Sequence, residues 1–218
     1  MSADPLLPGH LYGLRTWRVM AADGHPQLVG PYQHTAWPAG EPVRAVCSCG
    51  GAHAAPAPDC QCGVHALHPR PKSARRVLAG RGDIPGLVEA WGDVQVHDTG
   101  FRAAYGRPYA LVLLPGRNER LIRELARRYR VPVLELRKPA ELLAHCRASR
   151  LGLDEAVVDE LLSPGEADER RRARRRQARN NALRVVAAVV VGVATWALGS
   201  QIAGTPATHT APIAARQQ

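Results

Sequence analysis

Seven potential metal ligands lie close together between residues 47 and 68. They are four of the five cysteines and three of the nine histidines: Cys47, Cys49, His53, Cys60, Cys62, His65 and His68. Thiolate and imidazole are the ligands that zinc prefers, and four of them around one ion form a closed structural site. The loop that carries them is rich in proline, glycine and alanine, so a metal would supply a constraint that apolar packing cannot.

The spacing of these cysteines is unusual, because both pairs are C-x-C and not C-x-x-C. In an extended strand residues i and i+2 point to the same side, so Cys47 and Cys49 can face one ion. The predicted zinc ligands are Cys49, His53, Cys60 and Cys62, with Cys47 or His65 as substitutes. The alternatives are reduced, buried cysteines with surface histidines, and a redox-active pair.

The elements around the cluster predict an α+β domain over residues 1–150. Strand-forming residues dominate Leu11–Val19, and Gln27–Val29 and Val43–Ser48 are further short candidates. The last of these strands leads directly into the first cysteine pair. We expect residues 69–83 to form an exposed connection.

The second half of this domain has clearer patterns. Val88–His97 and Phe101–Tyr109 flank an Asp-Thr-Gly turn and predict paired strands. The continuation predicts a buried strand at Ala110–Leu114, a helix that Asn118 caps, a strand at Val131–Leu136 and a helix from Pro139 to about Arg147. This order indicates a βαβ unit with parallel pairing inside a mixed sheet.

An uncharged segment follows, from Val185 to Gly204. At about 1.5 Å per residue, twenty helical residues span about 30 Å, the hydrocarbon thickness of a bilayer. The segment predicts a single transmembrane helix over residues 185–204. The alternative is a buried core helix, but the segment follows a polar linker and does not lie within a domain.

A block of arginines precedes this segment. Its members are Arg170, Arg171, Arg172, Arg174, Arg175, Arg176, Arg179 and Arg184, in a predicted helical linker over residues 151–184. Basic flanks stay on the cytoplasmic side, so the N-terminal domain is predicted to be cytoplasmic and residues 205–218 to be a short outer tail. The first seven are also candidates for contact with anionic lipid headgroups, at about 1 kcal/mol each.

The net charge of the chain is +10, and subtracting the eight arginines of this block leaves +2. The rest of the chain is therefore nearly balanced. No aromatic residue interleaves the arginines to stack on bases, so a nucleic-acid-binding role is the weakest of the candidates.

Small residues recur along one face of the predicted transmembrane helix, at Ala188, Gly192, Thr195 and Gly199. Spacings of four, three and four let two membrane helices approach closely, which predicts a homodimer through this face. The alternative is that a segment rich in valine and alanine scatters small residues without function.

Few other residues have the pattern of a catalytic site. His97, Asp98, Arg102 and Tyr105 lie near a turn, where imidazole and carboxylate can do acid–base chemistry, although a turn with a surface histidine is far commoner. His145 and Cys146 are neighbours on a helix and do not face each other, so Cys146 is better explained as a core cysteine. The sequence contains no glycine-rich phosphate loop, G-x-S-x-G or H-E-x-x-H motif.

The segment HAAPAPDCQCG, with LYGLRTWRV before it and WGDVQVHDTGFRAAY after it, resembles a group of uncharacterised actinobacterial proteins. The resemblance covers roughly residues 11–137 and implies one folded domain in which the cysteine cluster has a role. It implies no reaction. The group often has an aromatic residue after Cys-Gly, where this chain has Val64 and His65.

Together these patterns predict a single-pass, C-terminally anchored protein of the cell membrane, with a cytoplasmic, zinc-stabilised binding or adaptor domain. The alternatives are a zinc- or thiol-dependent hydrolytic enzyme at the membrane and a nucleic-acid-binding module. The evidence for an enzyme does not outweigh that for a binding role.

Overall fold

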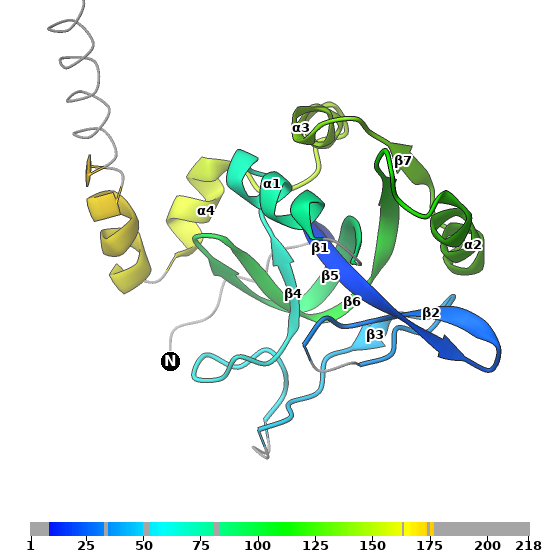
Figure 1. Ribbon diagram of the computed structural model, residues 1–218. Helices are drawn as coiled ribbons and strands as arrows, with labels where there is room; N and C mark the ends of the chain where they lie inside the picture. Colours follow the sequence, from blue (N-terminus) through cyan, green and yellow to red (C-terminus); the bar gives the residue numbers. More distant parts are fainter. Residues whose placement is uncertain are drawn as a thin grey trace, which may run out of the picture. The chain divides into compact units, whose positions relative to one another are not determined.

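The computed structural model describes residues 9–32, 35–49, 53–80, 83–162, 164–173 and 175–176. The chain divides into two units, Met1–Ala167 and Asp168–Gln218, and the strands and helices named here lie in the first. In chain order they are β1 (Leu11–Ala22), β2 (His25–Val29), β3 (Val43–Arg44), β4 (Val64–Leu67), α1 (Pro71–Ala79), β5 (Ile84–His97), β6 (Gly100–Leu113), α2 (Glu119–Tyr129), β7 (Val133–Glu135), α3 (Pro139–Ala148) and α4 (Glu155–Leu161) (Figure 1).

The fold is α+β, with a mixed sheet of seven strands. All pairings are antiparallel except that of β6 with β7. The pairings of β1 with β5, β5 with β6, β6 with β4 and β4 with β1 close a ring. The ring is closed weakly between β4 and β1, because these strands pair at one position only, Leu14 with Leu67.

The hairpin of β5 and β6 forms the centre of the sheet. Its strands pair from Gly86 with Leu111 to His97 with Gly100, with two register shifts that bend the ribbon. Gly100 lies at its turn, where a Cβ atom would be only 2.0 Å from the carbonyl oxygen of Ala66. Only glycine lets β4 approach β6 this closely.

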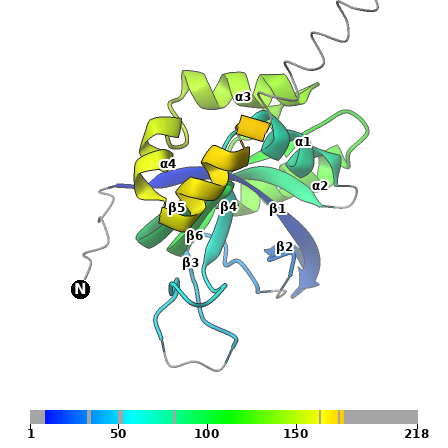
Figure 2. The same cartoon turned by 90° about the vertical axis from the view of Figure 1, so that its left-hand side faces the viewer.

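Helices cover the sheet from two sides (Figures 1 and 2). Helices α1 and α3 pack in one cluster of buried side chains that includes Leu14, Leu87 and Val112 of the sheet. Helix α2 packs in a second cluster around Trp17 and Leu111. A third, smaller cluster joins α4 to β5. All three clusters lie within Met1–Ala167, so this unit has its own hydrophobic core and can fold by itself.

The predicted βαβ unit is confirmed. Strand β6, helix α2 and strand β7 follow each other, and β7 lies parallel to β6. The side chain of Asn118 caps α2 by accepting a hydrogen bond of 3.1 Å from the backbone N–H of Leu121. The predicted hairpin and the helix that begins at Pro139 are also confirmed.

Two local predictions were wrong. Residues 69–83 are not a mere connection, because they contain α1, which begins at Pro71 and buries Ala74, Val77 and Leu78 at helical spacing. The strand predicted over Val43–Ser48 ends at Arg44, because β3 pairs with β6 at only two positions. The residues that follow it are therefore free to form the loop that carries the cysteines.

Among the described residues, no helix is long and apolar enough to cross a membrane. The predicted transmembrane helix over residues 185–204 lies outside the described residues, as do Arg174 and Arg179 and the four small residues of the predicted dimer face.

Candidate metal centre

The segment between β3 and β4 carries the cysteine cluster and projects from the sheet (Figures 1 and 2). Four potential ligand atoms gather in it, from Cys47, Cys49, His53 and Cys60, and all of them lie within 4.8 Å of one another. Each comes from a short stretch that no regular element constrains. Three sulfur atoms and one imidazole nitrogen are a ligand set that can hold a metal ion such as zinc.

Two of the three distances between the sulfur atoms are close to those expected around a shared metal ion. The Sγ atom of Cys60 lies 3.5 Å from that of Cys47 and 3.4 Å from that of Cys49. Two sulfurs at about 2.3 Å from a tetrahedral zinc are about 3.8 Å apart. The Sγ atoms of Cys47 and Cys49 are closer, at 2.7 Å, and would separate by about 1 Å on binding.

Hydrogen bonds shift the pKa values of Cys47 and Cys60 in opposite directions. The backbone N–H of Cys62, followed by the thiols of Cys49 and Cys47, lowers the pKa of Cys60 to about 6. The hydrogen bond with Cys49 raises the pKa of Cys47 to about 12. Cys60 therefore becomes a thiolate, the form that binds metal, more readily than Cys47 does.

The ligand set differs in part from the predicted one. Cys47, predicted as a substitute, belongs to the group within 4.8 Å, whereas Cys62 lies beside it, with its buried Sγ 3.4 Å from Nε2 of His53. His65, the other predicted substitute, is not among the four gathered residues, and its Nε2 lies 2.8 Å from the carbonyl oxygen of Gln61. His68 is buried against the carbonyl oxygen of His97 at 2.9 Å.

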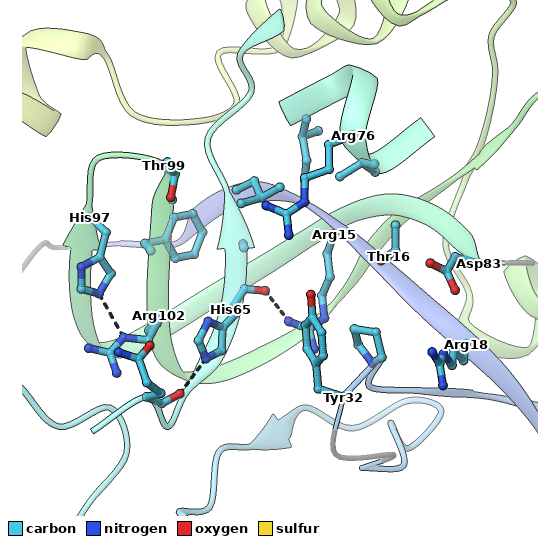
Figure 3. Close-up of a pocket in the computed structure, with 18 residues that line it drawn as sticks. Arg15, Thr16, Arg18, Tyr32, His65, Arg76, Asp83, His97, Thr99 and Arg102 are labelled. Carbon is cyan, nitrogen blue, oxygen red and sulfur yellow. Dashed lines mark hydrogen bonds between the residues drawn. The ribbon is translucent and has the colours of Figure 1, made fainter. Parts of the chain in front are cut away.

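Arg102 of β6 anchors the loop that carries the second cysteine pair. Its Nη1 donates hydrogen bonds to the carbonyl oxygens of Cys60 and Cys62, the latter at 3.2 Å. Its Nη2 donates to Oε1 of Gln95. Its Nε donates to Nε2 of His97 at 3.0 Å (Figure 3). Arg102 is only 3% exposed, so these bonds position the cysteine backbone from inside the protein.

Gly63 makes this anchoring possible. Its φ is +129°, and a Cβ atom at this position would lie 2.9 Å from Cβ of Arg102. A side chain would therefore separate the loop from the arginine that holds it. The sequence shows Gly63 directly after Cys62 and Arg102 shortly after the Asp-Thr-Gly turn. Their spacing along the chain does not indicate that these two residues meet.

The predicted acid–base residues do not converge on one point. The guanidinium group of Arg102 can only donate, so Nε2 of His97 accepts and its Nδ1 donates to Oε1 of Glu166 at 2.8 Å. Asp98 accepts from Nη1 of Arg70 at 3.2 Å, and Tyr105 stacks on Trp91 at 6.1 Å. Both nitrogens of His97 are thus engaged in structural contacts.

Two further ionisable side chains, Cys146 and Glu89, have pKa values that are shifted by their buried surroundings. Burial raises the pKa of Cys146 to about 11, which confirms it as an inert core thiol. Glu89 is buried on β5, and burial alone would raise its pKa. Hydrogen bonds from Arg107 at 2.5 Å, His10 at 2.6 Å and Tyr12 at 3.0 Å outweigh that effect and lower it. The carboxylate joins β1, β5 and β6.

Comparison of the chain with protein-family models, with curated proteins and with solved structures gives no match in any of the three. The resemblance to the actinobacterial group therefore stays a prediction, and the arrangement of the chain's own residues carries the functional argument.

Proposed function

We propose that this chain is a membrane-anchored binding module whose N-terminal domain is stabilised by a structural zinc ion. The observation that carries the proposal is the convergence of four protein ligand atoms, from Cys47, Cys49, His53 and Cys60, within 4.8 Å. Four protein ligands fill the tetrahedral shell of zinc and leave no position for a substrate.

The surroundings of the cluster support a structural role for the ion. The described residues of the segment that joins β3 to β4, 45–49 and 53–63, contain no helix or strand, so they gain little from backbone pairing. A metal that joins residues 47 and 49 to residues 53 and 60 would close this segment into a compact loop. Arg102 would then hold the loop against β6 through its carbonyl groups.

One observation favours the competing hydrolytic role. The cluster lines an open cavity of about 590 Å³, together with Asp59 and Gln61. If one of the four protein groups left the ion, a water molecule in this cavity could take its place, and an ion with three protein ligands and water is the usual catalytic arrangement.

X-ray absorption spectroscopy of the zinc-loaded chain separates the two roles. We expect a first shell of three sulfurs at about 2.3 Å and one nitrogen at about 2.0 Å. A shell with an oxygen in the fourth position would favour the hydrolase. A purified chain that folds but takes up no zinc would refute the structural role of the metal.

The proposed anchor is the uncharged segment over residues 185–204, with the arginine block on its cytoplasmic side. Arg170 is buried, so the predicted lipid contacts are those of the arginines from Arg171 to Arg179. The face of Ala188, Gly192, Thr195 and Gly199 would pair two copies. Such an anchor confines the binding domain to the inner surface of the cell membrane.

Removal of residues 185–204 is expected to move the protein from the membrane pellet to the soluble fraction of lysed cells, because no other stretch of the sequence has this length without charge. A matched control replaces the segment with twenty residues of mixed leucine and alanine, which should restore the pellet fraction. Retention in the pellet after deletion, under alkaline carbonate extraction, would contradict a transmembrane anchor.

A further inference from the structure

A second cavity, of about 640 Å³, is lined by none of the cysteines of the cluster. It opens where β1 and β4 diverge after their single paired position at Leu14 and Leu67. Helix α1, the turn of the β5–β6 hairpin and the loop after β2 complete its walls. Its volume is within the range of small-molecule sites, about 300–1,000 Å³.

Arginine dominates the charge of this cavity. Four arginines line it, Arg15, Arg18, Arg76 and Arg102, against one carboxylate among the described lining residues, that of Asp83. Figure 3 shows the side chain of Arg76 extending from α1 into the space that Arg15 of β1 borders. In the described part of the chain, no ion pair involves Arg15, Arg18 or Arg76.

Arg15 is held in place by two contacts, and one of its N–H groups has no partner among the described residues. Its Nη1 donates to the carbonyl oxygen of His65, and its guanidinium group lies 4.8 Å from the ring centre of Trp37. Its Nε is buried and has no hydrogen-bond partner among the described residues. Burial lowers the pKa of Arg15 to about 10, so the group stays charged at neutral pH. The guanidinium group is partly exposed, and its buried Nε–H lacks a partner among the described residues, which favours an anion nearby.

The rest of the cavity suits the organic part of a ligand. Leu14, Val77 and Phe101 form apolar wall, and Thr16 and Thr99 contribute hydroxyl groups. Tyr32 stands at the rim with 82% of its surface exposed, which leaves its ring available for stacking. Such a combination of cations, hydroxyls and one free aromatic ring fits a phosphorylated molecule better than an inorganic ion alone.

We propose that this cavity binds a phosphate-bearing organic molecule, with Arg18 and Arg76 on the phosphate oxygens. Arginine presents paired N–H groups that match phosphate oxygens two at a time, which makes it the preferred residue for such ligands. The inference rests on the proposed binding role of the domain, for which it names a ligand class, and none of the proposed phosphate contacts is made by the metal or by a metal ligand.

The cysteine loop nevertheless forms part of this site. Gln61, which separates Cys60 from Cys62, and His65 both line the cavity, and the Nε2 of His65 lies 2.8 Å from the carbonyl oxygen of Gln61. Arg102 borders the cavity and holds the same loop. A metal that fixes the loop would therefore also fix one wall of the phosphate site.

Isothermal titration calorimetry of residues 1–167 with ADP and with inorganic pyrophosphate tests the proposal. This unit has its own core and lacks the arginine block, which would bind anions without specificity. We expect one site per chain, with ADP affinity reduced about tenfold or more in Arg76→Gln and in Arg18→Gln. The matched control is Arg75→Gln, which removes the same charge from the same helix at an exposed position that does not line the cavity.

A second arm uses sedimentation with vesicles that contain phosphatidylglycerol, because a lipid headgroup carries the same phosphate ester. Loss of vesicle binding in Arg76→Gln but not in Arg75→Gln, without any ADP binding, would support the site and assign its ligand to the membrane. Equal losses in the two variants, or no binding in either arm, would overturn the proposal. Zinc content is measured on each sample, so a failure of the metal site is seen separately from a failure of the phosphate site.

Discussion

Replacing Cys60 with alanine is expected to reduce the metal content of the purified protein from about one zinc ion per chain to near zero. Cys60 is one of three cysteines whose Sγ atoms all lie within 3.5 Å of one another, and it alone joins the second half of the loop to the first cysteine pair. It is also the thiol whose pKa is lowered, to about 6, so its loss removes a sulfur that readily becomes the thiolate that binds metal. Elemental analysis of protein purified under reducing conditions measures the effect.

The control for this experiment is Cys146→Ala, which removes a thiol from the core between the sheet and its helices. This variant should keep its zinc and lose stability only, by about 1–2 kcal/mol for the lost buried volume. Zinc retained by Cys60→Ala but lost in Cys62→Ala would contradict the ligand set and replace Cys60 by Cys62, which lies 3.4 Å from His53.

Loss of the metal should have local consequences. The clusters of buried side chains on both sides of the sheet do not involve Cys47, Cys49 or Cys60, so the core should survive in Cys60→Ala. We expect hydrogen exchange to become fast in residues 45–63 and to change little in α2 and β6. Global unfolding of this variant would show that the metal stabilises the whole domain.

Replacing Arg102 with methionine is expected to weaken zinc binding by about 10- to 100-fold although Arg102 does not contact the metal, because groups that orient ligands typically have effects of this size. The substitution removes the donors that hold the carbonyl groups of Cys60 and Cys62. It also leaves these buried acceptors without a partner, so the free energy of unfolding should fall by about 3 kcal/mol. Competition with a chelating dye measures the affinity, and urea unfolding measures the stability.

Two variants distinguish positioning from charge. Arg44→Met removes a positive charge from the exposed position of β3, close in sequence to Cys47, and should leave zinc affinity within about twofold of the unaltered protein. Arg102→Lys keeps the charge but cannot reproduce the forked set of donors, so it should resemble Arg102→Met. If Arg102→Lys binds zinc normally, the geometry of the guanidinium group is not what holds the loop.

Local patterns were sufficient for the second half of the domain. The turn after His97 joins two long strands that follow each other directly in the sequence. Asn118 caps α2 through a hydrogen bond to a residue three positions away. Such features depend on neighbours in the chain, so the sequence displays them directly. The same holds for the cysteine cluster, because its four gathered ligands lie within fourteen consecutive positions, from Cys47 to Cys60.

Helix α1 could not be recognised in this way. Its sequence, PKSARRVLA, has three basic residues and only a short apolar stripe. The helix is stabilised because Ala74, Val77 and Leu78 pack in one cluster with Leu14 of β1 and Leu142 of α3, which are distant in sequence. Tertiary burial therefore decided an element for which local propensity gave little indication.

The sequence by itself determined the α+β class, the hairpin, the βαβ unit and the group of residues from which metal ligands are drawn, because each depends on periodicity or spacing over short distances. Only the tertiary structure decided that Cys47 joins the ligand group, that Arg102 anchors it from a strand forty residues away, and that Arg15, Arg18 and Arg76 line one cavity. The reason is physical: a guanidinium group finds its carbonyl or phosphate partner through the pairing of distant strands, and that pairing is fixed by burial of the whole sheet.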